Sequence, residues 1–78
     1  MDEKFKSILS IAIVPRIIDL IQTKEGLGDF ESLNAFYQSK TYTLLSEEHT
    51  KLWHYSPLTI YNIWKTEKEL GEIILPEE

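Results

Sequence analysis

The 78-residue chain contains no cysteine. This absence excludes disulfide bonds, thiolate nucleophiles and zinc sites built on cysteine, and it is typical of proteins from a reducing compartment. We therefore expect a cytoplasmic protein.

Basic residues are few, and Arg16 is the only arginine among them. Thirteen acidic residues stand against eight basic ones, which gives a formal net charge of −5. Because nucleic-acid binding relies on clustered Lys and Arg to neutralise phosphates, we expect no nucleic-acid partner. An acidic surface of this kind favours a basic protein partner, or it only keeps a small protein soluble.

Long hydrophobic runs are also missing. The longest run, residues 11–14, falls well short of the about 20 apolar residues that a membrane span needs. Asp2 and Glu3 do not fit a signal peptide, whose first region is basic. We expect no membrane partner and one domain, residues 1–78, since a chain of this length leaves no room for a second core.

Apolar residues in the first third of the chain recur at the three- and four-residue spacing of amphipathic helices. One stripe lies in residues 2–14 and the next in residues 14–26: Phe5, Ile8, Leu9 and Ala12, then Val14, Ile17, Ile18 and Ile21. Pro15 either kinks one helix or opens a second, and Gly26 and Gly28 end the element. The β-branched residues within residues 7–14 leave a strand there as the alternative.

Two shorter helices follow. Asp29 is the expected N-cap of a helix in residues 27–39, and Ser39 caps the next, in residues 40–48. The expected inner faces are Phe30, Leu33, Phe36 and Tyr37 in the first, then Tyr42 and Leu45 in the second.

The last helix is predicted to start at Ser56, which caps it, with Pro57 in its first turn, and to stop at Gly71. Its apolar stripe is Ile60, Ile63, Trp64 and Leu70, and its outer ion pairs are Lys65 with Glu69 and Lys68 with Glu72. The apolar residues 73–75 then dock on the bundle or pair with a neighbouring chain. The fold class is all-α, a small bundle of four to five short helices whose core contains Phe36, Tyr37, Trp64, Ile17, Ile18 and Ile60.

Trp53, His54 and Tyr55 precede this helix in a loop. The first interpretation places Trp53 at the end of the bundle, with its indole N–H donating to a carbonyl group. The alternative is an exposed aromatic loop that binds a partner, so these three residues, together with Ile13, are the candidate partner-binding residues.

The sequence contains only weak signals for a metal site or a catalytic site. His49 and His54 could supply zinc ligands, but their spacing does not place them on one helical face and no third ligand is fixed. The chain has no Gly-x-Ser-x-Gly elbow and no phosphate-binding glycine loop. We expect no enzymatic activity, no cofactor and no metal.

Residues 36–57 follow the pattern FYxSxxYxxLxxExTxLWxxSP, and Glu69 and Gly71 continue it. The pattern, with VPRIIDLI upstream, resembles a group of short bacterial proteins of unknown function, mostly from Firmicutes and their relatives. Similar small families occur beside genes for toxin-like or ADP-ribosyltransferase-like enzymes, which implies an antitoxin-like or accessory role. The resemblance implies no catalytic or binding residue.

Two classes of function stay open: a non-enzymatic protein–protein interaction module, or an antitoxin-like or regulatory accessory partner of a neighbouring toxin-like enzyme. Nine aliphatic residues within residues 8–21 surround the N-terminal helix rather than mark one face. A helix that is apolar all round must be covered on both sides. We therefore expect a homodimer held mainly by residues 5–21, unless residues 73–75 fold back over that side.

Overall fold

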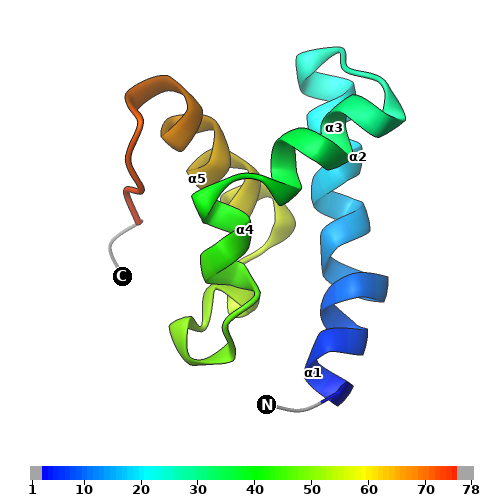
Figure 1. Ribbon diagram of the computed structural model, residues 1–78, viewed down its shortest axis with the longest axis vertical. Coiled ribbons are helices and arrows are strands. Elements are labelled where there is room, and N and C mark those ends of the chain that lie inside the picture. The colour runs from blue at the N-terminus through cyan, green and yellow to red at the C-terminus, as the bar shows by residue number, and fades with distance from the viewer. Residues whose placement is uncertain (1–2, 76–78) are drawn as a thin grey trace.

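The computed structural model describes residues 3–75, and every regular element in that range is helical (Figure 1). The elements are α1 (Glu3–Ile8), η1 (Leu9–Ile13), α2 (Val14–Glu25), α3 (Asp29–Tyr37), α4 (Lys40–Leu45), η2 (Glu48–Thr50), η3 (Leu52–His54) and α5 (Pro57–Leu70). Because α1, η1 and α2 follow one another without a break, they form one helical segment, and the described range holds four helices and two 3-10 turns. The all-α prediction is confirmed.

The N-terminal helical segment passes through Pro15 by means of a π-turn. Proline has no N–H, and its ring crowds the carbonyl group four residues earlier, here that of Ile11. In η1 the turn widens, and the N–H of Val14 donates to the carbonyl oxygen of Leu9, five residues back. The wide turn gives the ring room that a regular α-turn lacks. Pro15 therefore does not separate two helices, and the alternative of a strand in residues 7–14 is wrong.

The π-turn also changes which residues of this segment are buried. Leu9 and Val14, five residues apart, both reach the core. Ile8 and Ala12, which the three-and-four spacing assigned to the inner stripe, are exposed. The stripe of α2, in contrast, is as predicted, because no irregularity follows Pro15.

The core lies where α2, α3, α4 and α5 meet. Its buried apolar residues are Leu9, Val14, Ile17, Ile18, Ile21, Phe36, Leu45, Leu52, Ile60, Tyr61, Ile63 and Trp64. Five of the six residues predicted to be buried together are among them. The exception is Tyr37, whose exposed fraction is 45%.

Helix α3 differs from the prediction in its N-cap and in the face that it buries. Its N-cap is Gly28, so Asp29 is the first helical residue, and the Gly28 N–H donates to the Glu31 carboxylate at 3.1 Å. Its buried residues are Phe36 and the small Ser32, whose hydroxyl donates to the carbonyl oxygen of Gly28 at 2.8 Å. The buried hydroxyl of Ser32 therefore has its hydrogen bond within its own helix, and α3 packs against α2.

The predicted serine caps and glycine stops are present, but α4 ends at Leu45 and not at residue 48. Ser39 and Ser56 cap α4 and α5 by accepting the N–H groups of Tyr42, at 3.0 Å, and Thr59, at 3.2 Å. Gly26 and Gly71 end α2 and α5 with φ of 71° and 79°, a left-handed conformation that favours glycine.

The C-terminal half of α5 differs from the prediction in two respects. Leu70 is exposed, because it lies in the last turn, beyond the helices that cover the rest of the stripe. Lys65 and Lys68 both bind Glu25 of α2, in place of the predicted pairs with Glu69 and Glu72.

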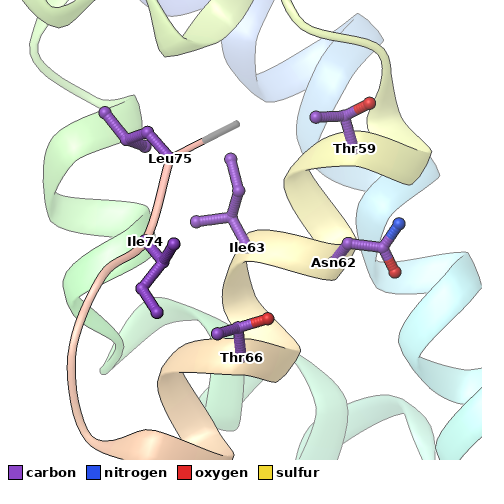
Figure 2. A pocket seen from close by; sticks show the side chains of 6 residues that line it. All are labelled: Thr59, Asn62, Ile63, Thr66, Ile74 and Leu75. Atoms are coloured by element: carbon purple, nitrogen blue, oxygen red, sulfur yellow. The ribbon is translucent and has the colours of Figure 1, made fainter. Parts of the chain in front are cut away.

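The C-terminal tail, residues 71–75, runs back along α5 (Figure 2). Ile73 packs against the core, which confirms that the tail docks on the bundle. Its last apolar residues and one face of α5 line a hollow of about 300 Å³: Ile74 and Leu75, with Thr59, Asn62, Ile63 and Thr66. The tail lies on the opposite side of the molecule from α1 (Figure 1), so it does not cover the N-terminal helix.

Candidate interaction surfaces

Two of the candidate partner-binding residues, Ile13 and Trp53, come together at the N-terminal end of the bundle. They line a hollow of about 290 Å³, named here the N-terminal hollow, with Lys4, Phe5, Ile8 and Glu48. The Trp53 indole N–H donates to the carbonyl oxygen of Glu48 at 2.9 Å, as predicted, and the ring meets that of Phe5 edge-on at 6.2 Å between centroids. Ile13 and Trp53 are both half-buried and pack against the core.

His54 and Tyr55 are not among the residues that line this hollow. Their rings stack on each other at 4.5 Å, and the His54 Nδ1 contacts the carbonyl oxygen of Lys51. His49 lies 3.8 Å from the carboxylate of Glu47, with both side chains exposed. Residues 3–75 contain no group of three His, Asp or Glu side chains placed to hold a metal ion.

A second, larger hollow lies between α2 and α3. Its volume is about 430 Å³, and we name it the α2–α3 groove. The lining combines apolar residues of both helices with polar ones at the margins: Val14, Pro15, Ile18, Leu33 and Tyr37, then Ser10, Asp19, Gln22 and Asp29. Gln22 donates to the carboxylate of Asp29, which ties the two helices together at one end of the groove.

Beside the groove, α3 carries an apolar face of its own. Phe30, Leu33 and Tyr37, spaced three and four residues apart, form this α3 apolar face. Their exposed fractions are 78%, 36% and 45%. Ile11 is also 77% exposed, and it follows Ser10, which lines the groove. The exposures of the three α3 residues differ from the prediction, which places all three on the inner face of the helix.

The carboxylate of Glu25 joins the end of α2 to α5. It accepts the Tyr61 hydroxyl at 2.6 Å and the Lys65 ammonium at 3.0 Å, and its other oxygen lies 3.5 Å from the Lys68 ammonium. The hydrogen bonds from Tyr61 and Lys65 lower the pKa of Glu25 from 4.5 to about 2. The partners lie 36 to 43 residues from Glu25 in the sequence, so no local pattern indicates this cluster.

The carboxylate of Glu67 joins α5 to the start of α4. It accepts the N–H groups of Lys40 and Thr41, both at 3.0 Å, and the Thr41 hydroxyl at 2.7 Å. Burial raises the pKa of Glu67, but these hydrogen bonds together outweigh burial and leave the pKa below its usual value. Among the described residues every buried side-chain nitrogen and oxygen has a hydrogen-bond partner.

Comparisons with protein-family models, curated proteins and solved structures find no match for this chain. The resemblance to short Firmicutes proteins therefore stays a prediction. None of the helices within residues 3–75 has the length and apolar character needed to cross a membrane.

Proposed function

We propose that this protein is a non-enzymatic interaction module that binds another protein through the α2–α3 groove and the α3 apolar face. The observation that carries the proposal is the orientation of α3. Of the four large apolar or aromatic side chains expected on its inner face, only Phe36 is buried. Leu33 and Tyr37 line the groove instead, and Phe30 is exposed.

This surface has the properties of a binding surface rather than of scattered exposed residues. Contiguous apolar patches next to a concave surface mark interaction sites on small proteins. Phe30 and Tyr37 are aromatic, and aromatic side chains are enriched where protein interfaces are buried. Both side chains stand on a helix whose own core contact, Phe36, is fully buried, so the surface is held in shape before a partner arrives.

The polar clusters support a non-enzymatic role. General acid–base catalysis needs a group whose pKa lies near the working pH. The pKa values of Glu25 and Glu67 are instead lowered, away from neutral pH. Their oxygens also accept hydrogen bonds from neighbouring helices. They are well suited to fasten helices together.

The N-terminal hollow is the less favoured surface. Trp53 already uses its indole N–H, and its ring contacts Phe5. Ile13 is half-buried and lies on a different flank of the N-terminal helix from the groove, so it is not the exposed interface residue that a dimer through residues 5–21 needs.

Site-specific photo-cross-linking tests the proposal directly. A photoreactive phenylalanine analogue is placed at Phe30 and, as a matched control, at Leu58 in cells that make the protein. Both are exposed residues in the second position of a helix, Phe30 in α3 and Leu58 in α5. We expect covalent protein adducts from position 30 well above those from position 58, and equal yields from both would refute the proposed surface.

A further inference from the structure

We propose that the α2–α3 groove binds a basic amphipathic helix of another protein. Apolar side chains of this helix enter the groove, and its Lys or Arg side chains pair with Asp19 and Asp29. This inference rests on the proposed function and names the chemistry of its partner. Three features of the groove support it: the apolar lining, the charge at its margins, and the helical backbone of its walls.

The apolar lining of the groove follows one side of each helix. Val14 and Ile18 lie one turn apart on α2, and Leu33 and Tyr37 lie one turn apart on α3. Val14 and Ile18 are buried, but Leu33 and Tyr37 are 36% and 45% exposed, so part of the lining is in contact with water. A partner gains free energy by covering this exposed part with apolar side chains of its own.

Every charged side chain that lines the groove is acidic. Asp19 is exposed on α2, and Asp29 is exposed in the first turn of α3. Within residues 3–75 neither carboxylate forms an ion pair, although Asp29 accepts a hydrogen bond from Gln22. Arg16, three residues before Asp19, does not line the groove. Lys or Arg side chains of a partner would therefore meet two carboxylates that the fold leaves without a cation.

The net charge of the whole molecule favours the same partner. The chain carries −5, so its field attracts a basic protein and repels an acidic one. A second copy bound through this groove on a two-fold axis would bring Asp19 and Asp29 of both copies to one interface. Because like charges oppose that arrangement, the groove suits a basic partner better than a second copy.

The walls of the groove are helices, which limits how a partner binds. The elements of residues 3–75 are all helical, so that part of the chain offers no strand edge to which an extended peptide could add. Pro-rich segments bind in aromatic-lined grooves, and within the described chain Tyr37 is the only aromatic side chain that lines this one. An amphipathic helix laid along the groove is the remaining mode.

The length of the groove sets the length of that helix. Its lining on α2 runs from Ser10 to Gln22, which spans about 18 Å at 1.5 Å per residue. A partner helix of about 12 residues covers this distance and presents about three turns to the groove. The volume of about 430 Å³ lies within the range of sites that enclose a bound group.

Isothermal titration calorimetry of the purified full chain with a synthetic peptide tests the inference. The probe is a peptide of about 18 residues in which leucines form one helical stripe and lysines flank it. One control peptide has glutamate in place of each lysine, and another has the same residues in an order without a stripe. We expect the probe to bind with a micromolar dissociation constant and both controls to bind at least about tenfold more weakly. Failure of the probe to bind, or equal binding of either control, would overturn the inference.

Paired substitutions test the charge contact. Asp19→Asn combined with Asp29→Asn removes both groove charges, and asparagine keeps the oxygen type that accepts the hydrogen bond from Gln22. The matched control combines Glu69→Gln with Glu72→Gln, two exposed carboxylates outside the groove. We expect the groove pair to weaken probe binding at least about fivefold and to reduce its salt dependence, and the control pair to change it less than about twofold. Equal losses would show that overall charge alone attracts the probe, and the inference would be wrong.

The apolar contact has its own pair of variants. Leu33 lines the groove, whereas Leu58 is an exposed leucine of α5 outside it. Leu33→Gln is expected to weaken probe binding at least about fivefold, and Leu58→Gln is expected to leave it unchanged. Circular dichroism melts verify that both variants fold. Unchanged binding by Leu33→Gln would place the peptide outside the groove and overturn the inference.

Cross-linking in cells separates this inference from the proposed function. The photoreactive analogue is placed at Tyr37, which lines the groove, and the cross-linked segment of each adduct is sequenced. A segment with Lys or Arg beside an apolar helical stripe supports the inference. An adduct of twice the chain mass of 9.2 kDa would identify a second copy as the occupant and overturn it. If the peptide titrations fail while adducts at position 30 still exceed those at position 58, the interaction surface stands and only the basic partner is wrong.

Discussion

Replacing Glu25 by glutamine removes one negative charge and keeps the shape of the side chain. In the folded protein this charge receives hydrogen bonds from Tyr61 and Lys65, and it also attracts Lys68. Hydrogen bonds to a charged group are worth about 1.5–3 kcal/mol, against about 1 kcal/mol for neutral ones. The side chain of Glu25 is only 13% exposed, but those of Lys65 and Lys68 are 43% and 55% exposed, which weakens the ionic part.

We therefore expect Glu25→Gln to lower the free energy of unfolding by about 2 kcal/mol at neutral pH. A domain of this size has about 5 kcal/mol of stability, so the loss is large. It corresponds to a fall in Tm of roughly 10 °C, measured by circular dichroism. Glu69→Gln serves as the control. It removes an exposed carboxylate from α5 and is expected to have little effect on stability.

The pH dependence of this difference identifies its cause. The pKa of Glu25 falls from 4.5 to about 2 on folding, so its contribution is fully present above about pH 4.5 and is lost as the pH falls toward 2. We expect the difference in unfolding free energy between the parent and Glu25→Gln to fall by more than half between about pH 5 and about pH 3. A difference that stays constant over this range would refute the assignment, because it would show that packing and not charge is responsible.

Three further substitutions test other parts of the fold in urea melts. Trp64→Ala is expected to cost about 3–5 kcal/mol, because it empties a site in the core, and a variant that melts like the parent would contradict that placement. Ser56→Ala is expected to cost about 1 kcal/mol and Ser56→Asp almost nothing, since aspartate caps equally well; if neither has an effect, the cap does not stabilise α5. Thr41→Val is expected to cost about 1 kcal/mol, because the Thr41 hydroxyl is buried and donates to Glu67, and an unchanged midpoint would argue against that bond.

Local chemistry made much of the fold predictable. Ser39 and Ser56 have hydroxyls that accept N–H groups within their own first turns, so neighbouring residues alone indicate the caps. Gly71 ends α5 for an equally local reason, since its backbone adopts the left-handed conformation. The contact of Trp53 is nearly as local, because its indole N–H needs an acceptor and the Glu48 carbonyl lies only five residues earlier.

The candidate interaction surface was not predictable in the same way. Hydrophobic periodicity finds the largest apolar residues of a helix, and in α3 these are Phe30, Leu33 and Tyr37 on one side. The structure instead buries the side that carries Ser32 and Phe36. That orientation depends on how α3 packs against its neighbouring helices, which no pattern within α3 encodes. The clusters around Glu25 and Glu67 were missed for a similar reason, since their partners are distant in sequence.

The carboxylate of Glu67 has a consequence for the order in which the helices form. Helix α4 has only six residues and is too short to persist alone in water. The N–H groups of Lys40 and Thr41 in its first turn are held by a side chain of α5, so that turn is complete only after α5 has docked. Helix α4 should therefore open and close together with α5 as one cooperative unit. Hydrogen exchange at these two amides then reports the separation of the two helices and not the fraying of α4.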